Sequence, residues 1–110
     1  MEIHFHGELV IVEGLVEEIS GKKIKGKADI KLADSEVTGN DHMLKFVDGL
    51  TVYRDEDADK FFVRSEQPTK IYCKVRDRHD DLILKENVDY IIFPAKEYDH
   101  MSQAIRQVRD

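Results

Sequence analysis

Two histidines near the start of the chain, His4 and His6, are separated by a single residue in the stretch HFHGE. Alternate side chains of a β-strand project from the same face, so both imidazole rings would point to one side. Such a pair offers two nitrogen ligands to one zinc ion. With His42 it forms a candidate metal site of His4, His6 and His42. The alternatives are that these histidines hydrogen-bond neighbouring loops together, with no cofactor bound, or that they are surface residues without a role.

A second candidate group surrounds His42 in the stretch SEVTGNDHML. Glu36, Asp41 and His79 could complete a metal site or form a structural hydrogen-bond network with His42. Residues 39–40 are Gly-Asn, and both types tolerate positive φ, so a tight turn is predicted before the strand that His42 begins. The stretch therefore favours a structural role for His42, with metal binding as the alternative.

Motifs for catalysis are missing from the sequence. Ser35 lies in no Gly-x-Ser-x-Gly elbow, and GKKIKGK lacks the ending of a phosphate-binding loop. The acidic run 55–59 lacks the spacing of a calcium loop. Cys73, the only cysteine, is predicted to be a small apolar filler of a strand, with a thiol nucleophile as the alternative. The sequence predicts no catalytic residue and favours a binding protein over an enzyme.

The charge balance argues against some classes of partner. The chain has 17 Lys+Arg against 23 Asp+Glu and a formal net charge of −6. A nonspecific nucleic-acid binder or a protein that docks on anionic lipid would normally be basic. No apolar run approaches the roughly 18 residues that span a bilayer, and Met1 is not followed by a signal segment. We expect synthesis in the cytoplasm and protein partners, with a homo-oligomer as one possibility.

Period-two patterning dominates the elements that must position these side chains. Residues 23–34 alternate apolar and charged types and predict one half-buried strand, kinked at Gly26. HMLKFV and LTVYR flank Asp48 and Gly49, a strong hairpin signal. Further strands are predicted from ELVIV, KFFVRSE, TKIYCKVRD, LIL and VDYIIFP. Seven or eight short strands indicate a mainly β chain, a small antiparallel β-barrel or sandwich.

The C-terminus changes to a helical period. Asp99 can cap a helix, and apolar residues follow at helical spacing at Met101, Ala104, Ile105 and Val108. A helix of about three turns needs a surface on which to dock. Residues 1–110 are thus predicted to form a single domain of short strands with a short C-terminal helix.

Three separated motifs together resemble a family of small, uncharacterised proteins of tailed phages and prophages. The first is HGE at residues 6–8, and the second is SEVTGNDH at residues 35–42, similar to a GEVTGHxH pattern. The third joins His79 and the following strands to a C-terminal end similar to REY…RRVxD. Asn40 replaces a histidine of the pattern, and Lys96 replaces an arginine. The change at Asn40 weakens the prediction of a metal site, since an amide is a poor zinc ligand.

The resemblance implies a phage context and no particular reaction. In that context we expect a structural protein, a small auxiliary or decoration protein of the capsid that acts by protein–protein binding and is located in the virion. A host-directed binding or inhibitor protein is the first alternative. A small metal-binding domain that uses His4, His6 and His42 is the second.

Overall fold

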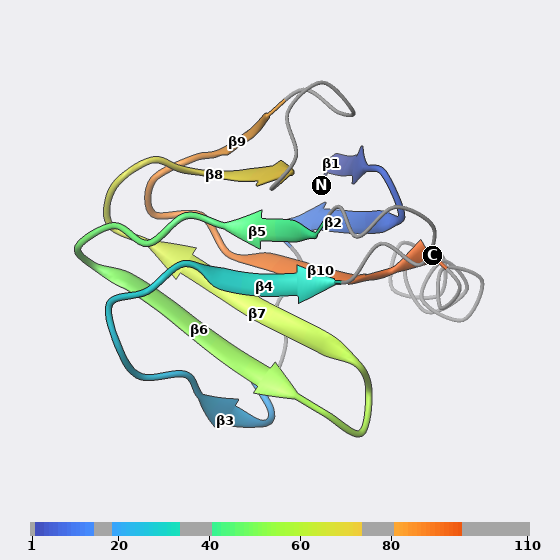
Figure 1. Ribbon diagram of the computed structural model, residues 1–110, viewed down its shortest axis with the longest axis horizontal. Helices are drawn as coiled ribbons and strands as arrows, with labels where there is room; N and C mark the ends of the chain where they lie inside the picture. Colours follow the sequence, from blue (N-terminus) through green and yellow to red (C-terminus); the bar gives the residue numbers. More distant parts are fainter. Residues whose placement is uncertain (1, 15–18, 34–40, 74–80, 96–110) are drawn as a thin grey trace.

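The computed structural model describes residues 2–14, 19–33, 41–73 and 81–95 (Figure 1). Ten β-strands form within these ranges, and every pairing between them is antiparallel. The strands are β1 (Glu2–His6), β2 (Leu9–Glu13), β3 (Lys22–Lys23), β4 (Ile30–Ala33), β5 (His42–Leu44), β6 (Leu50–Asp55), β7 (Lys60–Ser65), β8 (Thr69–Cys73), β9 (Leu82–Leu84) and β10 (Tyr90–Pro94). The predicted mainly β class is confirmed.

The strands form two separate sheets. A six-stranded sheet has the order β1-β2-β10-β7-β6-β3, and a four-stranded sheet has the order β4-β5-β8-β9. Among the described strands, the ends of each sheet stay open, so they form no closed barrel. The C-terminal helix predicted from residue 99 onward lies outside the described residues. No helix in the described ranges is long and apolar enough to cross a membrane.

One apolar core lies between the two sheets. It combines buried side chains of both, including Ile11 and Ile92 from the larger sheet and Leu44 and Ile71 from the smaller one. A second cluster occupies the opposite face of the larger sheet and consists of Val10, Val12, Phe62, Ile91 and Phe93. Strands β2 and β10 are therefore apolar on both faces, which explains the hydrophobic runs LVIV and YIIF within them.

The prediction of one strand over residues 23–34 is wrong. Strand β3 pairs with β6 in the larger sheet, whereas β4 pairs with β5 in the smaller one. Between them Gly26 has φ +114°, a conformation that strongly favours glycine. Burial alternates through Ile30, Lys31 and Leu32 of β4, but both residues of β3 are exposed, and the chain changes sheets between the two strands.

The predicted hairpin around Asp48 and Gly49 is also wrong, although the turn exists. The Leu50 N–H donates to the Val47 carbonyl at 3.2 Å, and Gly49 has φ +84°. The flanking strands β5 and β6 belong to different sheets, so this turn carries the chain from one sheet to the other. A tight two-residue hairpin joins β1 to β2 instead, and Gly7 in its turn has φ +59°.

Candidate functional site

Strand β1 directs His6 into the space between the sheets. It forms the edge of the larger sheet, and its register places His6 opposite Leu9 of β2. Cross-strand partners share a face of the sheet, and Leu9 belongs to the core between the sheets. The His6 residue is consequently only 3% exposed.

Strands β5 and β8 bring His42 and Cys73 to the same interior from the other sheet. The two residues are direct cross-strand partners, and the next pair on that face is Leu44 with Ile71 two residues along. Both Leu44 and Ile71 are fully buried core residues. His42 and Cys73 are 3% and 7% exposed. They therefore form a buried polar pair at one end of the apolar core.

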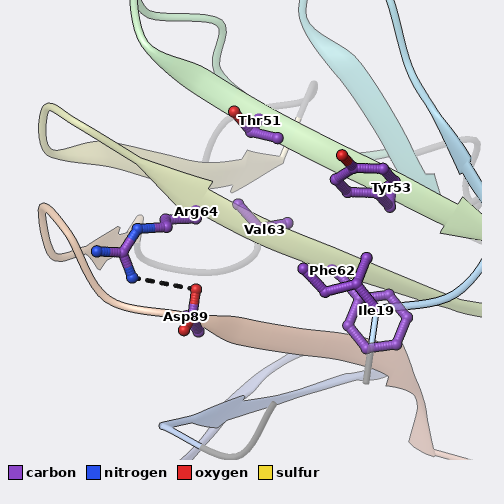
Figure 2. Close-up of a pocket in the computed structure, with 7 residues that line it drawn as sticks. All are labelled: Ile19, Thr51, Tyr53, Phe62, Val63, Arg64 and Asp89. Carbon is purple, nitrogen blue, oxygen red and sulfur yellow. Dashed lines mark hydrogen bonds and ion pairs between the residues drawn. The ribbon is translucent and has the colours of Figure 1, made fainter. Parts of the chain in front are cut away.

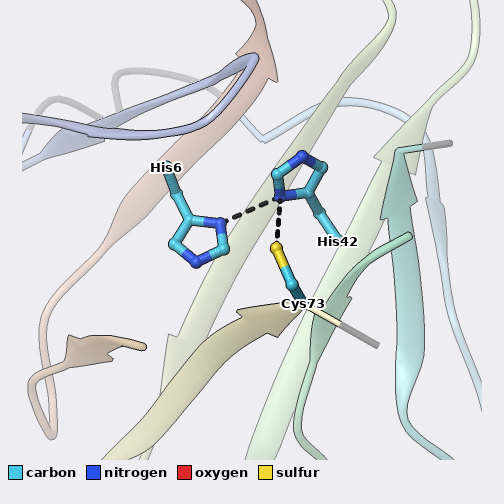
Figure 3. Close-up of side chains that lie close together, drawn as sticks. All are labelled: His6, His42 and Cys73. Carbon is cyan, nitrogen blue, oxygen red and sulfur yellow. Dashed lines mark hydrogen bonds between the residues drawn. The ribbon is translucent and has the colours of Figure 1, made fainter. Parts of the chain in front are cut away.

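The three side chains converge on one point, as Figure 3 shows. The Nδ1 atoms of His6 and His42 are 2.9 Å apart, and the Cys73 Sγ lies 3.8 Å from His42 Nδ1. The two imidazole rings are nearly perpendicular, with an interplanar angle of 79°. One ligand atom from each residue lies within 4.8 Å of the other two. We call His6, His42 and Cys73 the intersheet cluster.

Two kinds of chemistry fit the intersheet cluster. Without a metal, one imidazole donates its Nδ1–H to the Nδ1 lone pair of the other, which requires opposite tautomers on His6 and His42. With a metal, two imidazole nitrogens and one thiolate form a donor set that suits zinc. Either arrangement ties β1 of one sheet to β5 and β8 of the other.

His4 belongs to a different group of side chains. Its Nε2–H donates to a Glu13 carboxylate oxygen at 3.1 Å and lies 3.5 Å from Glu2. The Lys85 ammonium approaches Glu13 at 3.2 Å. The hydrogen bond from His4, followed by Lys85, lowers the pKa of Glu13, and partial burial opposes the shift. The structure therefore brings His6 and His42 together but places His4 in an acidic cluster at the sheet edge.

The remaining predicted residues do not join the intersheet cluster in the described part of the chain. The Asp41 carboxylate faces Lys31 at 3.8 Å. Glu36 and His79 lie outside the described residues. The cluster member that sequence reasoning left out as a ligand is Cys73, although its alternation with Ile71 placed it on the inner face. No sequence pattern indicated that the inner face of β8 meets His6.

A surface pocket of about 200 Å³ lies on the outer face of the larger sheet (Figure 2). At one end the Arg64 guanidinium pairs with the Asp89 carboxylate at 3.2 Å. Ile19, drawn away from this ion pair in Figure 2, is 52% exposed. We call this the outer pocket, and its lining residues are Ile19, Thr51, Tyr53, Phe62, Val63, Arg64 and Asp89.

Comparison of the chain with family models, curated proteins and solved structures found no match.

Proposed function

We propose that the chain is a small auxiliary protein of a tailed-phage virion, a decoration protein of the capsid that acts by binding another virion protein. The phage context is supported by the three sequence motifs, which occur in the order and spacing of the phage family that they resemble. The binding role is supported by the outer pocket, and this is the observation that carries the proposal.

The size and lining of the outer pocket suit a protein partner better than a small substrate. Small-molecule sites usually measure roughly 300–1,000 Å³, whereas this cavity measures about 200 Å³. That volume accommodates one or two anchoring side chains. Tyrosine and arginine are enriched at protein interfaces, and here Tyr53 and Arg64 line the pocket together with the exposed Ile19.

The position of the imidazole and thiol groups argues against catalysis. His6, His42 and Cys73 are each less than a tenth exposed. A nucleophile or general base must reach its substrate, and these groups face one another inside the core instead. A structural role for the intersheet cluster leaves the outer surface to carry the function.

A host protein is the alternative partner, because the net charge of −6 complements a basic surface. Mass spectrometry of purified particles of the encoding phage separates the two. Incorporation into the particle supports the virion role. Absence from the particle, together with a stoichiometric host partner in a pull-down, would establish the inhibitor role instead.

The outer pocket is tested by Ile19→Asp, which places a charge at an exposed apolar position. Ile83→Asp is the matched control, because Ile83 is 61% exposed on β9 of the other sheet. We expect Ile19→Asp to fold but to be lost from particles, and Ile83→Asp to be retained. Equal incorporation of both variants would show that the partner binds elsewhere.

A further inference from the structure

We propose that His6, His42 and Cys73 bind one zinc ion, which joins the two sheets. This site differs from the three-histidine set expected from the sequence, because Cys73 takes the place of His4. It is independent of the proposed virion role, since a buried structural metal is compatible with any partner at the surface.

Two of the three spacings between the ligand atoms lie near those of a tetrahedral zinc site, and the third is at most 4.8 Å. Zinc bonds of about 2.0–2.1 Å to nitrogen and about 2.3 Å to sulfur place two nitrogens about 3.3 Å apart, and nitrogen and sulfur about 3.6 Å apart. The observed separations are 2.9 Å between His6 and His42 and 3.8 Å between His42 and Cys73. Small rotations of the side chains would therefore admit the ion.

The donor set selects the metal. One thiolate and two imidazoles favour zinc over magnesium or calcium, which take oxygen ligands. The thiolate also cancels one of the two positive charges that zinc brings into the core. The Glu2, His4 and Glu13 group offers mainly carboxylates and is more exposed, so it is the weaker zinc site.

Zinc would engage one atom of each of the three groups at the same time. The Nδ1 atom of His42 is the one that approaches both His6 and Cys73. A ring nitrogen carries either one proton or one lone pair, so it makes a well-directed bond with only one of these two neighbours. A metal between the three groups takes one lone pair from each.

The site would anchor an edge strand. In the described chain, β1 pairs with β2 alone, and its other side is the end of the larger sheet. A metal held by His6 from β1, His42 from β5 and Cys73 from β8 adds a link from this edge to the opposite sheet. Zinc would thus fasten an edge strand of the larger sheet that backbone pairing holds from one side only.

The test is to titrate the reduced, metal-free protein with Co²⁺ and, separately, with Zn²⁺. We expect about one equivalent of metal per chain and a near-ultraviolet charge-transfer band typical of a Co²⁺–thiolate bond. Because Cys73 is the only cysteine, the band by itself identifies Cys73 as the thiolate ligand of the metal. Zn²⁺ should displace Co²⁺ and abolish the band.

Two variants identify the ligand set. Cys73→Ser is nearly isosteric and should lose the band, whereas His4→Asn should keep it. Binding of less than about a tenth of an equivalent by the folded wild-type protein would overturn the proposal. So would a band that His4→Asn removes, because the site would then include His4. Binding without a thiolate band would also overturn it, since the metal would then lie elsewhere.

Discussion

His42 lies directly opposite Cys73 in the antiparallel pair of β5 and β8. This relationship fixes an imidazole and a thiol side by side on the inner face of the smaller sheet. His6 reaches the same point from β1 of the larger sheet, 2.9 Å from His42. Three polar groups that are far apart in the sequence therefore occupy one end of the shared core, and zinc binding there would affect the stability of the whole fold.

Zinc should stabilise the folded protein. A ligand present at about 100 times its Kd contributes about 2.7 kcal/mol. For a domain of this size that corresponds to a rise in Tm of roughly 10–20 °C. Thermal unfolding followed by circular dichroism, with added Zn²⁺ or with a chelator, measures the difference. His6→Asn should unfold at the same temperature in both conditions, whereas a zinc-dependent rise in that variant would contradict the assignment of His6.

Tyr72→Phe should destabilise the protein in a pH-dependent way. The Tyr72 hydroxyl donates to the Asp29 carboxylate, which also accepts from the Phe46 N–H at 2.8 Å. The bond from Tyr72, with a further contribution from Phe46, lowers the pKa of Asp29. The same bond raises the pKa of Tyr72 to about 12. The loss near neutral pH should be about 1 kcal/mol or less, because the pair is largely exposed.

The direction of each shift sets the pH window of this effect. The depressed pKa of Asp29 gives stability that is present above its unfolded value of about 3.9 and is lost as the pH falls through the folded value. The raised pKa of Tyr72 gives stability that is present below about 10 and is lost as the pH rises through about 12. Urea unfolding should therefore show the largest difference in free energy of unfolding between the wild type and Tyr72→Phe at pH values between these limits. A difference that stays constant across the range would contradict the pairing.

Gly21→Ala should destabilise far more than Gly14→Ala. Both glycines have positive φ, at +94° and +84°, so alanine brings a backbone strain of about 1–2 kcal/mol at either position. At Gly21 the new Cβ would also lie 2.1 Å from the backbone oxygen of Arg54, whereas at Gly14 it meets no atom within 4 Å. We expect an additional loss of about 2 kcal/mol or more for Gly21→Ala. Equal losses in urea unfolding would show that β6 yields to the methyl group at little cost.

Local patterns predicted most of the strands, because alternation reports which face of a strand is buried. Ile71 and Cys73 alternate on the buried face of β8 in this way. The pattern carries no information on which sheet a strand joins, and this is why Lys23 and Ile30 seemed to share one strand. Pairing is a contact between distant segments, as the meeting of His6 with His42 and Cys73 also is. The sequence could therefore nominate His6 and His42 but could not separate them from His4.

The two-faced hydrophobicity of β2 has a consequence for how the edge hairpin is aligned. If β2 shifted by one residue against β1, one apolar face of LVIV would replace the other in the core. The loss of buried apolar area would therefore barely disfavour the shifted register. His6 does distinguish the alternatives, because a one-residue slip of β1 would turn its imidazole away from His42. The buried contact between His6 and His42 thus specifies one register of β1 against β2, whereas burial of apolar residues alone would allow two.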